Sequence, residues 1–213
     1  MAFGGAMAPT GALGLTVVKR HRKVSAAWTA KNWVQNRLRE LPALFVYRVI
    51  GRIIPLVTIQ SALYLKVLHA DGTSTDYGCV GRRVVTDVGV AYIVDAFQNS
   101  VELENMKYHG FGTGTGAEAA GDTALGTELT TQYAVDSTRP TGTTTEGASA
   151  NIYRTVATLS PDSGGTIAIT EHGVFSASSA GVLLDRTKFS AVNLVAGSDS
   201  LAATYELTLS SGS

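Results

Sequence analysis

The C-terminal third of the chain has the most regular alternation of hydrophobic and polar positions. From Leu201 to Leu209, apolar or aromatic side chains at every second position alternate with small or polar ones. This period of two is typical of a strand that buries one face. Four further runs have strand length and composition, and turn residues separate most of them. These runs predict short antiparallel strands at residues 152–159, 166–170, 173–177 and 183–190.

The region before these strands adds another strand and a turn. Leu63, Leu65 and Val67 share one face of a predicted strand. Asp71 and Gly72 form the type of pair that predicts a tight turn after it. A strand that continues toward residues 84–85 is expected to follow this turn.

One helix is predicted between Thr86 and about Asn99. Thr86 is a suitable N-cap residue, because its hydroxyl can accept a hydrogen bond from a free backbone N–H of the first turn. A short strand at residues 106–111 then leads into a loop of Gly and Thr. The apolar residues on one side of the helix are Val90, Ile93, Val94 and Phe97.

Residues 117–147 form a long polar segment with three apolar anchors, Leu125, Leu129 and Tyr133. The segment is longer than a passive connection, so we expect it to pack on something and to contain one helical turn. Carboxylates here and elsewhere are scattered singly. We therefore expect them to lie on a solvated surface.

These elements predict a mainly β fold: an antiparallel β-sandwich or jelly-roll-like domain with one short helix, preceded by a basic N-terminal arm that contains a helix. The alternating strands and helices of a parallel α/β sheet are missing. The composition agrees, since 45% of the residues are hydrophobic, 23 are Gly and only 16% are charged. Such low charge is typical of a subunit within an assembly or of a soluble β domain with a quiet surface.

The charges are divided unevenly along the sequence. Residues 1–60 contain nine Lys and Arg against one acid, and residues 61–213 contain eight against sixteen, which gives +8 and −8. We therefore expect a basic arm at 1–60 and an acidic, Gly/Thr-rich β domain at 61–213. The sequence leaves open whether residues 43–60 belong to the arm or to the first sheet.

The arm contains a predicted amphipathic helix at about residues 26–41. Ser25 can cap its N-terminus, and Pro42 ends it because the residue before proline avoids the helical region. The apolar positions that follow the helical period are Ala30, Trp33, Val34, Leu38 and Leu41.

The cations and tryptophans of the arm are the one cluster that we assign to partner binding. They are suited to docking on an acidic protein surface, with the tryptophans as anchors. Contact with nucleic acid, an anionic bilayer, or solvent alone are the alternatives. The residues assigned to partner binding are Lys19, Arg20, Arg22, Lys23, Trp28, Trp33, Arg37 and Arg39.

The apolar stretch from Ala43 to Leu65 is not expected to cross a membrane. It contains Arg48 and Arg52 near its centre, and two arginines there cost about 5–7 kcal/mol on insertion scales. Cys79 is the only cysteine, which excludes an internal disulfide. We expect it to be a small buried apolar residue.

The segment from Gly110 to Gly116, Gly-Phe-Gly-Thr-Gly-Thr-Gly, superficially resembles a phosphate-binding loop. A P-loop requires a Lys that does not follow here, and the dinucleotide fingerprint requires a βαβ unit that is missing. We therefore expect a flexible or tightly turning loop rather than a nucleotide site.

No motif predicts catalysis, a cofactor or a metal. The histidines at 21, 69, 109 and 172 lack the spacing of metal ligands, and no hydrolase elbow is present. Glu171 and His172 are adjacent, so on a strand they point to opposite faces. We expect a protein that is not an enzyme and has no cofactor, metal or small-molecule substrate.

Several segments between about residues 82 and 210 resemble a family of tailed-phage structural proteins. The segments cover about 60% of the chain and are fold motifs rather than catalytic ones. They are the runs at 83–92, 108–114, 121–125, 150–158, 169–176, 184–193 and 199–201, of which Ile169-Thr170-Glu171-His172-Gly173-Val174-Phe175-Ser176 is typical.

The resemblance implies a non-enzymatic, β-rich subunit of a virion, at the capsid surface. We expect a head decoration (cement) protein that bridges coat subunits, binds the major capsid protein and neighbouring copies of itself, and forms a trimer. The alternatives are a tail, fibre or baseplate adaptor and, second, a nucleic-acid-binding protein that acts through the arm. Together with the family motifs, the uneven division of charge favours self-assembly, in which the arm of one subunit lies on the acidic face of a neighbour.

Overall fold

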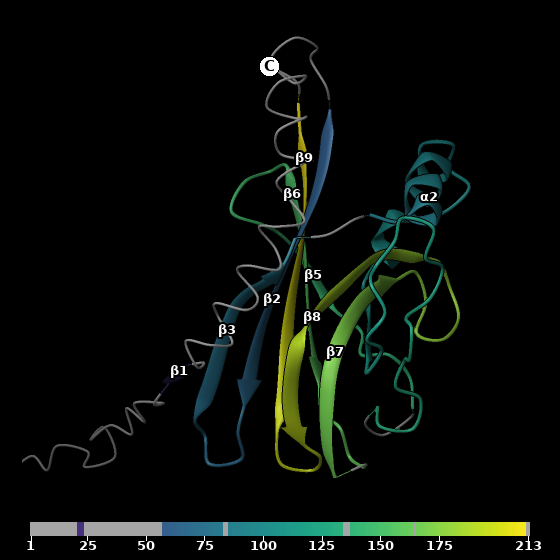
Figure 1. The fold of residues 1–213 in the computed structure, drawn as a ribbon. Coiled ribbons are helices and arrows are strands. Elements are labelled where there is room, and N and C mark those ends of the chain that lie inside the picture. Colours follow the sequence, from purple (N-terminus) through teal and green to yellow (C-terminus); the bar gives the residue numbers. More distant parts are fainter. Residues whose placement is uncertain (1–20, 24–56, 83–84, 134–136, 164, 212–213) are drawn as a thin grey trace, which may run out of the picture.

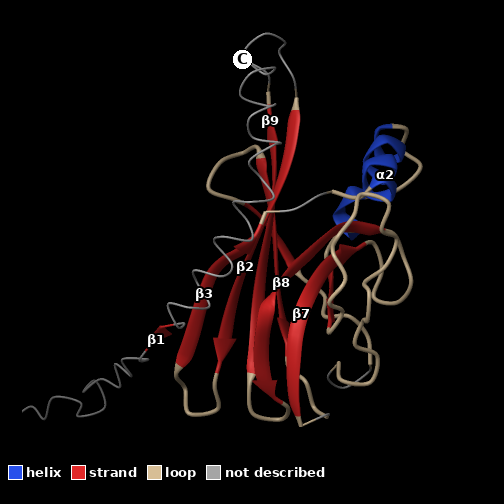
Figure 2. Cartoon of the chain, viewed as in Figure 1, coloured by secondary structure: helices blue, strands red, loops and turns tan. Residues whose placement is uncertain are grey.

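In the residues that it describes, the computed structural model forms two β-sheets, one α-helix and one 3-10 helix (Figures 1 and 2). It describes residues 21–23, 57–82, 85–133, 137–163 and 165–211. Within these residues the fold is mainly β, with two antiparallel sheets and one short helix, which confirms the predicted fold class. The predicted arm helix lies outside the described residues.

The larger sheet has the strand order β1-β3-β2-β9-β6-β5. β2 and β9 are its centre, and they pair antiparallel over their full length. β1 differs from the other five strands because it joins in parallel, at the β3 edge. The bounds are β1 His21–Lys23, β2 Thr58–Leu68, β3 Ser74–Gly81, β5 Thr143–Glu146, β6 Ile152–Leu159 and β9 Ser200–Ser210.

The smaller sheet is antiparallel, with the strand order β4-β7-β8. Its strands are β4 Tyr108–Gly112, β7 Thr166–Phe175 and β8 Leu183–Val195. Buried side chains from both sheets belong to one core cluster. The two sheets therefore pack face to face as a sandwich.

The alternation of β2 and β9 places one face of each strand in this core. Leu63, Leu65 and Val67 are at most 1% exposed, as their shared face predicts. They belong to the same cluster as Ile169 of β7 and Val192 of β8. Burial of each such side chain contributes about 1.5–3 kcal/mol, so this contact holds the sheets together.

Helix α2, Asp87–Phe97, follows β3 and packs on β8. Its predicted cap is confirmed, because the backbone N–H of Gly89 donates to Oγ1 of Thr86 at 3.0 Å. A Cβ at Gly89 would lie 2.6 Å from the carbonyl oxygen of Leu184. The glycine thus permits a close approach between the helix and the backbone of β8.

The outer edge of β4 is covered by segments of the long polar excursion. The backbone N–H of Leu129 donates to the carbonyl of Phe111, and that of His109 donates to the carbonyl of Pro140. Leu129 and the other two predicted anchors are buried. The prediction that the excursion packs on the domain is confirmed, and the packing protects a sheet edge from pairing with other chains.

Some predicted elements have different bounds. The two strands predicted at 166–170 and 173–177 form one strand, β7, with a register shift between Ile169 and Glu171. The helical turn predicted in the excursion is wrong for its described residues, which instead contain β5. β5 was missed because its Thr-Thr-Thr-Glu sequence is exposed throughout and has no apolar alternation.

Candidate interaction surface

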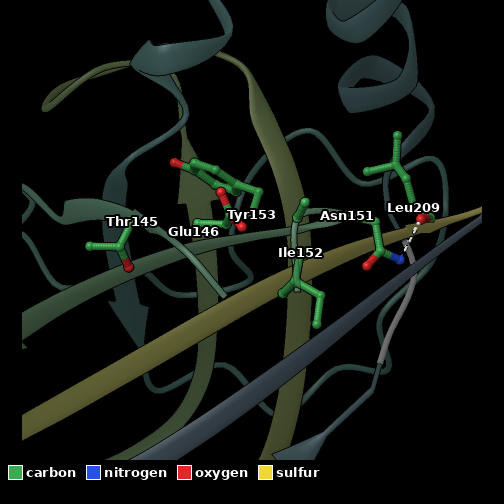
Figure 3. A pocket seen from close by; sticks show the side chains of 7 residues that line it. Thr145, Glu146, Asn151, Ile152, Tyr153 and Leu209 are labelled. Atoms are coloured by element: carbon green, nitrogen blue, oxygen red, sulfur yellow. Dashed lines mark hydrogen bonds between the residues drawn. The ribbon is translucent and has the colours of Figure 1, made fainter. Parts of the chain in front are cut away.

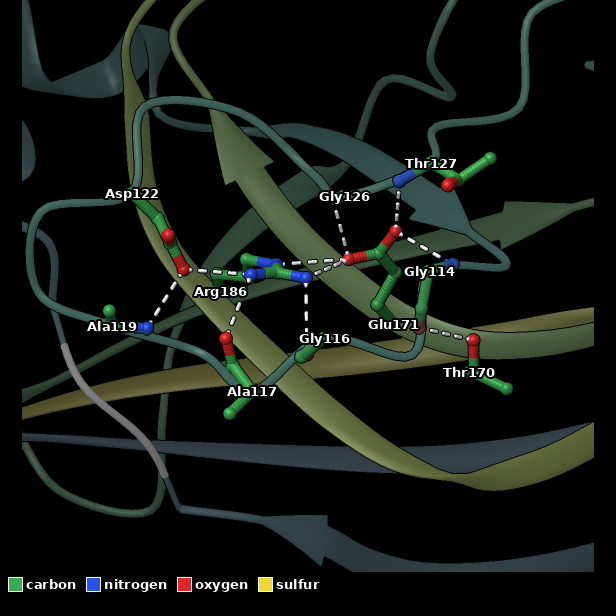
Figure 4. A network of polar contacts seen from close by, with 10 residues as sticks. All are labelled: Gly114, Gly116, Ala117, Ala119, Asp122, Gly126, Thr127, Thr170, Glu171 and Arg186. Carbon is green, nitrogen blue, oxygen red and sulfur yellow. Dashed lines mark hydrogen bonds and ion pairs between the residues drawn. The ribbon is translucent and has the colours of Figure 1, made fainter.

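The glycine-rich segment after β4 encloses a carboxylate of the protein itself. Gly114 donates its backbone N–H to Oε1 of Glu171 at 2.9 Å (Figure 4). A Cβ at Gly114 would collide with that carboxylate, and a Cβ at Gly112 would lie 2.6 Å from the same oxygen. The glycines are therefore required for close approach to Glu171.

Glu171 is fully buried and accepts hydrogen bonds on both carboxylate oxygens. Thr127 donates its backbone N–H to Oε1 at 2.7 Å, and Gly126 donates to Oε2 at 2.9 Å. Nε and Nη2 of Arg186 donate to Oε2 at 2.9 and 2.7 Å. A buried carboxylate with this many donors has its desolvation compensated.

Arg186 connects this carboxylate to a second acid. Its Nη1 donates to Oδ2 of Asp122 at 2.8 Å, and the same oxygen accepts the backbone N–H of Ala119 at 2.8 Å. Arg186 is on β8 and Glu171 on β7, whereas Asp122 belongs to the excursion. The ion network thus fastens residues 114–127 to the outer face of the small sheet (Figure 4).

The charges in this network stabilise one another. Burial alone would raise the pKa of Glu171, but the N–H groups of Thr127 and Gly126 and the Arg186 guanidinium lower it overall. Burial acts in the same direction on Asp122, and Arg186 again lowers its pKa overall. Both carboxylates therefore remain ionised at neutral pH. Because both are paired with Arg186, neither is available to act as a general base.

A second ion pair, between the buried Arg139 and the partly buried Glu128, fastens the next part of the excursion. Arg139 donates from Nε and Nη2 to both oxygens of Glu128, at 2.5 and 2.8 Å. Its Nη1 also donates to the carbonyl of Ala177 at 3.0 Å, and its guanidinium lies 3.4 Å from the centre of the Phe175 ring. Tyr133 adds a hydrogen bond from its hydroxyl to Glu128 at 3.0 Å.

A buried histidine pair lies on the inner side of the small sheet. Nδ1 of His109 and Nε2 of His172 are 2.9 Å apart, and Nε2 of His109 is 3.1 Å from Oγ1 of Thr155. Burial lowers the pKa of His109 to about 3 and, with His109 nearby, lowers that of His172 well below its usual value. Both rings are neutral, and the pair links β4, β7 and β6.

Of two predictions about individual residues, one is confirmed and one is wrong. Glu171 and His172 do point to different partners, as adjacency on a strand requires. The expectation that scattered carboxylates are solvated is wrong for Glu171 and Asp185, which are both fully buried. Asp185 accepts hydrogen bonds from Ser61 at 2.7 Å and Thr187 at 2.9 Å.

A shallow pocket lies at the end of the large sheet, lined by Thr145, Glu146, Ala150, Asn151, Ile152, Tyr153 and Leu209 (Figure 3). Its polar groups are used within the protein. Nδ2 of Asn151 donates to the carbonyl of Leu209 at 2.9 Å, and the Tyr153 hydroxyl donates to the carbonyl of Met106 at 2.6 Å. The pocket therefore offers a ligand few free polar partners beyond the exposed Glu146.

Outside the interior, helix α2 presents an apolar stripe to solvent. Val90, Val94 and Phe97 are spaced at i, i+4 and i+7 and are 43%, 49% and 82% exposed. Three of the four apolar residues that the sequence placed on one side of the helix form this stripe. The fourth, Ile93, packs in part against the core, which is also contacted by Tyr92.

Of the residues assigned to partner binding, Arg22 and Lys23 lie in β1, where their backbone pairs with Thr75 and Asp76. The remaining six lie outside the described residues: Lys19, Arg20, Trp28, Trp33, Arg37 and Arg39. Their assignment stays a prediction. Sequence patterns did not reveal the Glu171–Arg186–Asp122 network, since its members come from three distant segments.

In the described part of the chain, no group of three or more His, Cys, Asp and Glu side chains is placed to hold a metal ion. No helix there has the length and apolar character needed to cross a bilayer. Cys79, expected to be buried, is partly exposed. No family model matches the chain, and no curated protein matches it.

Proposed function

We propose that the chain is a capsid decoration (cement) protein of a tailed phage, which stabilises the head by bridging coat subunits. The sequence resemblance described above suggests this class. The structural observation that carries the proposal is that the glycine-rich loop binds a carboxylate of the protein itself. Its Gly114 N–H binds Glu171, so the loop serves to build a rigid scaffold rather than to hold a phosphate.

The described surface supports a role in protein contacts. The outward face of the large sheet combines uncharged side chains, among them Ala62 of β2, Val156 of β6 and Ala202 of β9, with Lys66 and the Arg154–Glu206 ion pair. A face on which charges of both signs lie among uncharged side chains is suited to contacts with other subunits.

The proposed partners are the major capsid protein and neighbouring copies of the chain, arranged as a trimer at the capsid surface. Many repeated weak contacts would hold the shell together, because linked contacts raise one another's effective concentration. The basic arm, with Lys19, Arg20, Arg22 and Lys23, adds contacts to acidic surfaces of these neighbours.

Stoichiometry in purified virions tests the location. A decoration protein is expected in many copies in the head fraction, whereas a tail, fibre or baseplate adaptor is expected in few copies in the tail fraction. Absence from virions would contradict both structural proposals.

Charge removal tests the role of the arm. A variant with Lys19, Arg20, Arg22 and Lys23 changed to Gln is expected to bind heads more weakly. A Lys107→Gln, Lys188→Gln variant, whose two changes lie outside the strands of the large sheet, is expected to bind normally. DNA binding whose log affinity falls with log salt by about 0.9 per neutralised phosphate would instead favour the nucleic-acid alternative.

A further inference from the structure

The apolar stripe on α2 belongs to a segment whose charged side chains are all acidic. Within residues 85–106 the chain contains no Lys or Arg but four exposed carboxylates, Asp87, Asp95, Glu102 and Glu104. The last two are held next to the helix, because the Tyr92 hydroxyl donates to the carbonyl of Glu102 at 3.0 Å. An exposed Phe and two Val among carboxylates form a surface for a basic, amphipathic partner.

One segment of the same chain has the complementary composition. Residues 26–41 are predicted to form an amphipathic helix with Trp33 on its apolar side, and they contain Lys31, Arg37 and Arg39 against one acid. Aromatic anchors with neighbouring cations are the residue types that bind to such a surface.

β1 runs toward the end of the large sheet at which β3 leads to α2. β1 pairs in parallel with β3, with Lys23 opposite Asp76. β3 continues from Asp76 to Gly81, and α2 begins six residues later at Asp87 (Figure 1). Parallel strands share a direction, so at Lys23 the chain is heading toward the end of the sheet from which α2 begins.

We infer that the stripe of Val90, Val94 and Phe97 is the docking site of residues 26–41 of the same chain. Covalent attachment favours this occupant over a second copy in dilute solution, because a tether gives an effective concentration of the order of millimolar. The carboxylates of α2 and residues 102–104 orient the basic side of the segment, and the stripe receives its apolar side.

Tryptophan fluorescence of the full chain tests this inference directly. Trp28 and Trp33 are the only two tryptophans, so the emission reports on this segment alone. We expect emission at a short wavelength and protection from acrylamide. Val94→Ser and Phe97→Ser should each shift the emission to longer wavelength and increase quenching.

Val195→Ser provides a matched control. Val195 on β8 is 48% exposed, against 49% for Val94, and lies outside the stripe. Its replacement should leave the emission unchanged. Two double variants test the role of charge. Glu102→Gln with Glu104→Gln should increase quenching. Glu146→Gln with Asp162→Asn, which removes two carboxylates exposed elsewhere, should not. Circular dichroism establishes that each variant is folded.

Unchanged emission in both Val94→Ser and Phe97→Ser would overturn the inference. A protected emission that develops only as protein concentration rises would also overturn it, since the occupant would then be a second copy. The inference concerns the isolated chain and does not depend on the proposed place in a virion. Its failure leaves head binding untouched, and failure of head binding leaves the fluorescence result untouched.

Discussion

Glu171 on β7 and Arg186 on β8 are joined by two hydrogen bonds to one carboxylate oxygen, at 2.9 and 2.7 Å, with Glu171 fully buried. The pair is 15 residues apart in sequence and is completed by backbone N–H groups from a third segment. It positions the glycine-rich loop on the small sheet. Removal of either partner leaves a buried group without its counterpart.

Glu171→Gln is expected to destabilise the fold by about 3–5 kcal/mol, because it leaves the Arg186 charge and several donors poorly compensated. Denaturant unfolding measures the change. Glu206→Gln is the control, since its partner Arg154 has a side chain that is 33% exposed, and such pairs contribute about 0–1 kcal/mol. Equal losses in the two variants would contradict a special role for Glu171.

Gly114→Ala is expected to destabilise by about 1–3 kcal/mol, as other overpacked sites do. The new methyl group would collide with the Glu171 carboxylate and lie 2.9 Å from the backbone nitrogen of Thr127. Gly116→Ala is the matched control in the same loop, because nothing lies within 4 Å of its Cβ position. The two unfolding free energies should differ, and a neutral Gly114→Ala would be inconsistent with the close approach.

Gly89→Ala tests the packing of α2, because helix propensity and close packing predict changes of opposite sign in the free energy of unfolding. In an unconstrained helix this change stabilises by about 1 kcal/mol. Here the methyl group would lie 2.6 Å from the carbonyl oxygen and 2.8 Å from Cα of Leu184. We expect destabilisation and a lower melting temperature. Ala91→Gly, on the exposed side, should cost about 1 kcal/mol from helix propensity alone.

The histidine pair predicts a loss of stability in mild acid. The folded-state pKa of His109 is lowered to about 3, whereas an unfolded histidine titrates near pH 6.5. Below about pH 6.5 the unfolded chain therefore takes up a proton that the folded chain does not, and by about pH 5 this costs about 2 kcal/mol. Unfolding measured from about pH 7 to about pH 5 should show this decline.

The His109→Gln variant should lose less stability over the same pH range, even if its stability at neutral pH is lower. An unchanged pH dependence would contradict the assignment of this loss to His109.

Glu171 affects stability in a separate, lower pH range. Its folded pKa is lowered, so its contribution is present above the unfolded value near 4.3 and is lost as pH falls through the folded pKa.

Local patterns were sufficient for the elements that have one buried face. The alternation at 201–209 and the shared face of Leu63, Leu65 and Val67 predicted β9 and β2, and Thr86 predicted the start of α2. The mainly β fold class followed from the same patterns. β5 escaped prediction because an exposed edge strand lacks the apolar period on which such predictions depend.

The buried polar clusters could not be predicted in this way. Glu171 is an isolated carboxylate in the sequence, and its partners Gly114, Thr127 and Arg186 are 57, 44 and 15 residues away. Only the pairing of β7 with β8 and the return of the excursion bring them together. The sequence predicted a turning loop at the glycine-rich segment, but the reason for its glycines, the close approach to Glu171, was not visible.

The sequence by itself determined the fold class, the strands with one buried face, the cap of α2 and the division of charge, because these depend on neighbouring residues and on composition. The tertiary structure alone decided which carboxylates are buried, why Gly114 must be glycine, and that the described elements leave Val90, Val94 and Phe97 exposed. The physical reason is that desolvation, close approach and exposure depend on contacts between distant segments, which no local period records.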